Sequence, residues 1–92
     1  MDGLEEAREG INDTDRQMAA LFCRRMEYSR IIGDYKAAHG LPIRDEDRER
    51  TLRERNLSYI ASPEMKEYYG HFLDAVIDIS CEYQQKLREG RK

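Results

Sequence analysis

The amino-acid sequence predicts an all-α fold of three helices, the first of them very long, assembled as an intertwined helical homodimer. Three observations support this prediction. Apolar residues recur at helical spacing along most of the 92 residues, no stretch has the alternation of a strand, and the first helical pattern is too long for a compact chain of this size. We expect a single domain over residues 1–92.

The first helix is expected over about residues 3–39. Asp2 and Glu5 have the spacing of a capping box at its start, and Gly40 followed by Pro42 marks its end. Such a helix is about 54 Å long, whereas a compact chain of this length has a diameter of roughly 32 Å. Part of the helix therefore extends beyond its own monomer, and we expect a second copy of the chain to cover it.

The inward face of this helix is expected to follow alternating steps of four and three residues. The stripe continues through the part that extends beyond the monomer, so the first helices of two chains should pack against each other. Its positions are Leu4, Arg8, Ile11, Asp15, Met18, Phe22, Arg25, Ser29, Ile32 and Lys36.

Two shorter helices are expected to follow. The second should span about residues 45–60, with Asp45 as its N-cap and acidic residues in its first turn. The third should span about residues 63–88, with Ser62 as N-cap and Pro63 as the first helical residue. Expected inward positions are Arg48, Glu49, Leu52, Asn56 and Tyr59 or Ile60 in the second helix, and Met65, Tyr69, Phe72, Val76, Ser80, Tyr83 and Leu87 in the third, with Leu73, Ile77 and Gln84 beside them.

Three cations interrupt the inward stripe of the first helix, which suggests an anionic ligand. Arg25 and Lys36 are separated by a rise of about 16 Å, so their side chains can bracket a small molecule. Arg8 lies about 25 Å from Arg25 along a straight helix and can reach the same ligand only from the partner of an antiparallel dimer. Because arginine suits carboxylates, we expect a dicarboxylate.

Composition limits the remaining possibilities. Charged residues make up 38% of the chain, yet the net charge is only −3, which does not favour nucleic-acid binding. No apolar run is long enough to span a membrane, and the N-terminus lacks the apolar core of a signal peptide, so we expect a cytoplasmic protein without a membrane partner. Cys23 and Cys81 are expected to be reduced thiols, and we expect neither a metal site nor a cofactor.

Polar residues at fixed spacing across all three helices carry a family resemblance. Each motif is weak alone, but together and in this order they resemble the all-helical chorismate mutases over nearly the whole chain. The motifs are Arg8-x-x-Ile11-x-x-x-Asp15, Arg25, Gly33-x-x-Lys36, Pro42-Ile43-Arg44-Asp45-x-x-Arg48-Glu49 and Ser80-x-x-x-Gln84.

The resemblance implies the conversion of chorismate to prephenate, an intramolecular Claisen rearrangement in phenylalanine and tyrosine biosynthesis that needs no cofactor. It implies four catalytic residues. Arg25 would hold a substrate carboxylate, and Lys36 would reach a carboxylate and the ether oxygen. Gln84 would donate to the same ether oxygen, and Glu49 would hold the ring hydroxyl.

The resemblance also implies an intertwined dimer in which each site borrows Arg8 from the partner chain. Asp45 would contribute through its backbone, while Arg48 and Ser80 would line the substrate site. Apolar walls would come from Ile32, Ile77 and Cys81. Asp15 keeps a structural role.

Two alternatives remain at this point. An isochorismate pyruvate lyase of the same fold would share the cationic pocket, and product analysis on both substrates separates it from a mutase. A non-catalytic helical dimerisation or anion-sensing module would bind an anion without turnover.

Overall fold

The computed structural model describes residues 3–90, and this part of the chain consists of three helices without a strand. The helices are α1 (Gly3–Ala38), α2 (Glu46–Leu57) and α3 (Pro63–Gly90). The all-helical prediction is confirmed. Helix α2 ends earlier than expected and α3 ends slightly later, while the expected N-cap Asp2 lies outside the described residues.

Local sequence signals account for the helix ends. Gly40 has a φ of 63°, a conformation that glycine adopts without a steric penalty. The Leu41 N–H donates to the Lys36 carbonyl at 2.8 Å and the Gly40 N–H donates to Ala37 at 3.3 Å, which is the Schellman pattern that terminates α1. Ser62 directly precedes α3 and caps it, because its hydroxyl accepts from the Met65 N–H at 3.3 Å.

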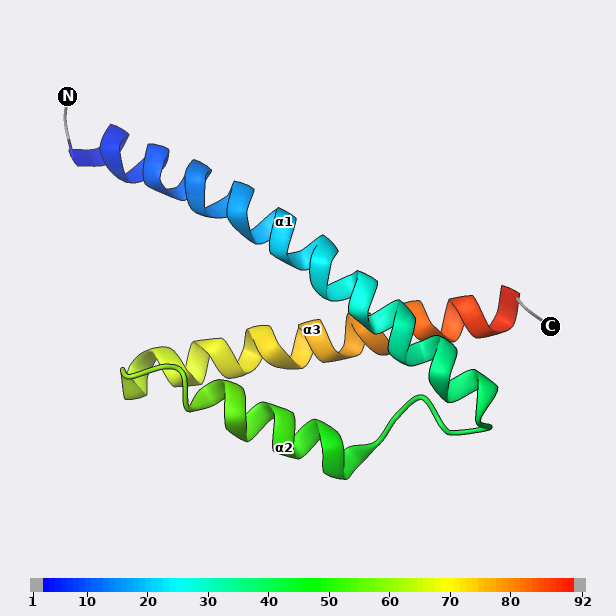
Figure 1. Ribbon diagram of the computed structural model, residues 1–92. Helices are drawn as coiled ribbons and strands as arrows, with labels where there is room; N and C mark the ends of the chain where they lie inside the picture. Colours follow the sequence, from blue (N-terminus) through cyan, green and yellow to red (C-terminus); the bar gives the residue numbers. More distant parts are fainter. Residues whose placement is uncertain (1–2, 91–92) are drawn as a thin grey trace.

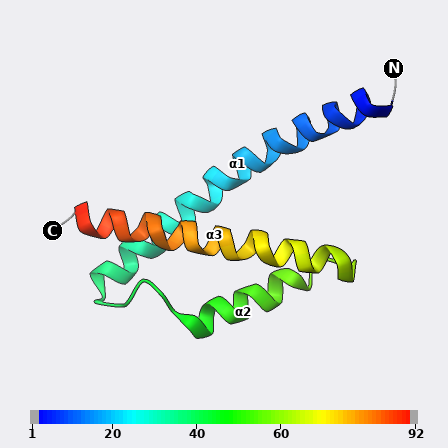
Figure 2. The same ribbon diagram turned by 180° about the vertical axis from the view of Figure 1, so that it is seen from behind.

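The three helices form an open arrangement. Helices α2 and α3 lie side by side as an antiparallel pair, and α1 crosses the C-terminal half of α3 (Figures 1 and 2). The N-terminal half of α1 extends away from both (Figure 1). The described chain measures 56 × 27 × 14 Å, with a radius of gyration of 16.6 Å, whereas a compact chain of this length would have about 12 Å.

Small residues allow α1 and α3 to approach closely where they cross. Ser29 and Gly33 of α1 are buried against Ser80 and Gln84 of α3. A Cβ atom on Gly33 would lie 2.8 Å from Gln84 Cγ, so only glycine fits this crossing without a shift of the Gln84 side chain.

A single chain has very little core. Among the apolar residues described, only Leu73 and Ile77 are almost inaccessible, at 4% and 8% exposure. The apolar members of the inward stripe of α1 are exposed: Leu4, Ile11, Met18, Phe22 and Ile32.

The inward stripe expected for α3 is covered only in part within one chain: Ser80 is buried, and Tyr69, Val76, Tyr83 and Leu87 are half-buried. Met65 and Phe72 are exposed, and the buried residues follow a neighbouring stripe. The reason is that α1 crosses α3 instead of running along it, so the Phe72 side has no cover from the same chain. The buried positions of α3 are Gly70, Leu73, Ile77, Ser80 and Gln84.

The inward stripe expected for α2 holds in part, since Glu49, Leu52, Asn56 and Ile60 are half-buried. Arg48 is exposed, and Tyr59, at 69% exposure, lies beyond the end of the shortened helix. No helix in residues 3–90 is both long and apolar enough to cross a membrane.

Candidate active site

A cavity of about 430 Å³ lies between α1, α3 and the beginning of α2. Its polar lining contains seven of the eight site residues expected from the sequence: Arg25, Lys36, Asp45, Arg48, Glu49, Ser80 and Gln84. The three expected apolar wall residues, Ile32, Ile77 and Cys81, line it as well. Residues from all three helices, together with Asp45 just before α2, thus meet around one cavity.

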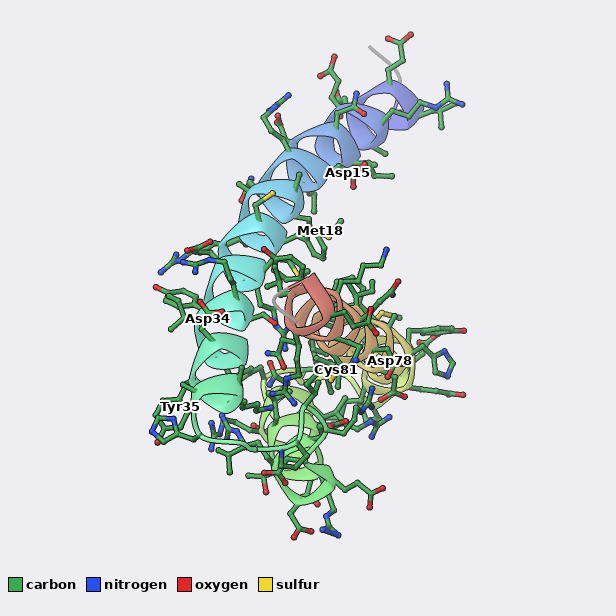
Figure 3. All side chains as sticks on the ribbon, turned by 90° about the vertical axis from the view of Figure 1, so that its right-hand side faces the viewer. Asp15, Met18, Asp34, Tyr35, Asp78 and Cys81 are labelled. Carbon is green, nitrogen blue, oxygen red and sulfur yellow. The ribbon has the colours of Figure 1, made fainter. Side chains whose placement is uncertain are left out.

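Arg8 is the expected site residue that the cavity of the same chain does not include. It is exposed on the part of α1 that extends away from α3. In Figure 3, Asp15 and Met18 mark this part of α1, far from Cys81 in the cavity wall. Because α1 is one uninterrupted helix, Arg8 cannot fold back toward Arg25.

Arg25 is held by a hydrogen bond across the crossing of α1 and α3. Its Nη1 donates to Ser80 Oγ at 2.5 Å. Arg25 is half-buried and Ser80 is buried, so the serine hydroxyl fixes the guanidinium from the side of α3. A guanidinium has five N–H donors, which leaves several for an anion in the cavity.

Lys36 is oriented by the segment that connects α1 to α2. Its Nζ donates to the Ile43 carbonyl at 2.6 Å. An ammonium has three donors, so this bond fixes the position of the charge and leaves two N–H groups available.

The Gln84 amide is buried and bonded to Ser29 on α1. Its Nε2 donates to the Ser29 carbonyl at 2.8 Å and lies 3.1 Å from Ser29 Oγ. Gln84 Oε1 is buried and has no hydrogen-bond partner in the described part of the chain. In this arrangement both amide N–H groups of Gln84 contact Ser29. To donate to a ligand, Gln84 has to give up its 3.1 Å contact with Ser29 Oγ.

Sequence reasoning assigned no role to Ser29, although a signal was present. A small polar residue at an inward position of a helix indicates a buried hydrogen bond. Tyr28, Ile43 and Leu52 also line the cavity without having been expected there, and nothing in their spacing distinguishes them from ordinary packing residues.

The beginning of α2 is organised by Asp45 and Glu49. The Asp45 side chain accepts from the Arg48 N–H at 3.0 Å, as expected for an N-cap. The Asp45 N–H in turn donates to Glu49 Oε2 at 3.1 Å, and Arg44 Nη2 lies 2.7 Å from Glu49 Oε1. Both oxygens of Glu49 are therefore held by groups next to the cavity.

Cations and a shielded thiol dominate the chemistry of the cavity. Arg25, Lys36 and Arg48 face the space that also contains the carboxylates of Asp45 and Glu49. Burial raises the pKa of the Cys81 thiol, which favours its neutral form. Within residues 3–90, no group of three or more histidine, cysteine or acidic residues is placed to hold a metal ion.

Comparison with known proteins shows the family of this chain. The family model described as chorismate mutase type II matches residues 7–85. The chain is also similar to the T-protein of Haemophilus influenzae, with 39% identity over 49 residues, which are 53% of this chain. The matched stretch spans 13% of the length of that relative. Since the family model covers most of the chain, including all three helices, this chain belongs to the chorismate mutase type II family.

Proposed function

We propose that this chain is a cytoplasmic chorismate mutase that works as a homodimer and rearranges chorismate to prephenate in the cavity between α1, α2 and α3. The observation that carries the proposal is the convergence of the seven expected polar residues on one cavity of a family member. They come from positions up to 59 residues apart, between Arg25 and Gln84, so their meeting is a property of the fold and not of one motif.

The reaction is an intramolecular Claisen rearrangement, so the protein contributes positioning and electrostatic stabilisation. Arg25 and a partner's Arg8 would hold the two carboxylates, which keeps the flexible side arm of chorismate over its ring. Glu49 and the backbone of Asp45 would hold the ring hydroxyl. Arg48 and Ser80 would complete the polar lining, the serine through its bond to Arg25.

Negative charge grows on the ether oxygen as the C–O bond breaks. Donors placed there bind the transition state more tightly than the substrate. Lys36 retains two N–H groups beside its bond to Ile43, and Gln84 would offer the N–H that now contacts Ser29 Oγ. Neither group has to lose or gain a proton during the reaction.

Support for the homodimer comes from the surface that a single chain leaves exposed. The N-terminal half of α1 carries apolar residues without cover, and Arg8 lies there as well. A groove of about 380 Å³ between α1, α2 and α3 is lined by Met18, Phe22, Tyr69, Phe72 and other mainly apolar residues. A second α1 would cover this surface and bring its Arg8 to the cavity.

The proposal is tested by following the loss of chorismate absorbance at neutral pH and identifying the product. We expect prephenate from the wild type, and a fall in kcat of about a hundredfold or more for Lys36→Ala and for Gln84→Ala, because each removes one donor to the ether oxygen. Lys86→Ala is the matched control, since Lys86 is exposed and does not line the cavity.

Three outcomes would contradict the proposal. Wild-type turnover in Lys36→Ala would remove its assigned role. Pyruvate release from isochorismate, without conversion of chorismate, would indicate the lyase. A folded chain that binds chorismate but converts neither substrate would be an anion-binding module.

A further inference from the structure

Arg44 belongs to the motif that precedes α2, yet it does not line the active-site cavity. We propose that Arg44 is a positioning residue that holds the Glu49 carboxylate in the cavity wall and anchors it to Asp78 of α3. This inference rests on the proposed function, because it concerns how Glu49 is presented to the substrate.

The geometry is a bridge between two carboxylates. Arg44 Nη2 lies 2.7 Å from Glu49 Oε1, and Arg44 Nη1 lies 3.0 Å from Asp78 Oδ1. The second oxygen of Glu49 accepts from the Asp45 N–H at 3.1 Å. Two consecutive residues therefore fix both oxygens of one glutamate, and Asp78 fixes the arginine.

Arg44 acts from behind the cavity wall. A second hollow of about 380 Å³, on the other side of Glu49, is lined by Arg44 and Asp78. Glu49 and Ile77 line both spaces, so they form the partition between them. Arg44 can consequently hold Glu49 without occupying the space of a ligand.

The second hollow is not itself an anion site, because its arginines are already paired. Arg44 bonds to Glu49 and Asp78, Arg53 Nε bonds to Asp74 at 3.0 Å, and Arg50 pairs with Asp47. The charged residues of this second hollow therefore favour a role for Arg44 in holding Glu49 in position.

The residue type fits the role. A planar guanidinium presents two N–H groups to two different carboxylates, whereas a lysine ammonium is a single point charge. Hydrogen bonding to Asp78, together with the charge of Glu49, raises the pKa of Arg44. The Arg44 guanidinium therefore stays protonated when it pairs with the two carboxylates. Exposed ion pairs add little to stability, so the expected effect of Arg44 is on the position of Glu49 and not on folding.

The test compares Arg44→Ala with Arg53→Ala. Arg44, just before α2, pairs with Asp78 of α3, and Arg53, within α2, pairs with Asp74 of α3. The two arginines have similar exposure, but the ion pair with Glu49 is made by Arg44. We expect Arg44→Ala to lower kcat/KM for chorismate roughly ten- to a hundredfold, since a displaced binding group misaligns the substrate. Arg53→Ala should stay within about twofold of wild type, and the two variants should melt at similar temperatures.

A second variant separates positioning from a general structural effect. In a Glu49→Gln background, Arg44→Ala should cause little further loss, because the two residues act as one unit. The chemical shift of the Glu49 carboxyl carbon, measured with labelled glutamate and assigned by its absence in Glu49→Gln, should change in Arg44→Ala and stay unchanged in Arg53→Ala.

Any of three outcomes would overturn the positioning role and leave the mutase proposal intact. They are wild-type kcat/KM in Arg44→Ala, an unchanged Glu49 carboxyl signal in Arg44→Ala, and a loss of kcat/KM from Arg44→Ala that is the same in the wild-type and Glu49→Gln backgrounds. A wild-type chain that does not convert chorismate would instead refute the proposed function, and the role of Arg44 in it.

Discussion

The contact between Gly33 and Gln84 decides how closely α1 and α3 can cross. We predict that Gly33→Ala destabilises the protein by about 1–3 kcal/mol, as overpacking of a tight contact does. The added Cβ would lie 2.8 Å from Gln84 Cγ and 3.3 Å from Gln84 Cβ, so the whole side chain must move and activity should fall too. Denaturant unfolding and chorismate turnover measure the two effects.

Gly10 provides the matched control on the same helix. A Cβ there meets no atom within 4 Å, so Gly10→Ala should gain about 0.5–1 kcal/mol from better helix propensity. Equal behaviour of the two alanine variants would show that the crossing tolerates an extra carbon.

Cys81 gives a prediction on pH dependence. Burial raises its pKa, so at a given pH less thiolate is present than in a free thiol. In a Cys23→Ser background, we expect iodoacetamide to modify Cys81 severalfold more slowly than a free thiol at neutral pH, with the rise in rate displaced to higher pH. Mass spectrometry follows the reaction. Chorismate should slow it further because Cys81 lines the cavity, and a rate like that of a free thiol, unaffected by chorismate, would contradict both statements.

At the level of elements, the start of α2 depends on one side chain. Asp45 accepts the Arg48 N–H and places its own N–H on Glu49, so it both caps the helix and orients a site residue. We predict that Asp45→Ala costs about 1 kcal/mol, which corresponds to a fall in Tm of about 4–8 °C for a domain of this size. Asp45→Asn retains an acceptor of similar strength and should melt near wild type. If both variants lost the same stability in thermal scans, the loss would come from charge and not from the cap.

The end of α1 and the beginnings of α2 and α3 were predictable because their causes are local. Gly40, Asp45 and Ser62 each act on backbone groups within a few residues, and the structure has helix boundaries at these positions. In the polar lining of the cavity, Arg25 and Lys36 were predictable because they interrupt the inward stripe of α1. The roles of the other five residues followed only from the resemblance to the all-helical chorismate mutases.

Other features depend on contacts that no local pattern contains. The buried face of α3 is set by where α1 and α2 pack against it, with α1 close at Gly33 and α2 close at Gly70. The bond between Gln84 and Ser29, and the bridge from Arg44 to Asp78, join residues 55 and 34 positions apart. Such pairings become visible only when the helices are placed in space.

For the whole molecule, the shape of the chain and the distance of Arg8 from the cavity of its own chain lead to the same expectation. A chain 56 Å long with two well-buried apolar side chains in its described part has a small core, and we expect it to be stabilised by a second copy. The surface lacking cover is the part of α1 that bears Arg8. A symmetric pair of chains would cover both copies of this surface and supply one Arg8 to each cavity.

Mixed dimers provide the decisive test of this shared site. Arg8→Ala and Lys36→Ala should each be nearly inactive alone. When the two variants are unfolded together and refolded at equal amounts, half of the dimers should be hybrids. Each hybrid then has one intact site, with Arg8 from the Lys36→Ala chain and Lys36 from the Arg8→Ala chain. We therefore expect about 25% of wild-type activity in the mixture.

The control mixture combines Arg25→Ala with Lys36→Ala. These two residues line the same cavity of one chain, so every site of a hybrid lacks one of them and the mixture should stay inactive. Sedimentation would verify that both mixtures are dimeric. If activity recovers in the first mixture and not in the control mixture, Arg8 must act across the interface. If the first mixture stayed as inactive as its parents, while hybrids were shown to form, Arg8 would have no place in the partner's cavity. The open half of α1 would then need another explanation.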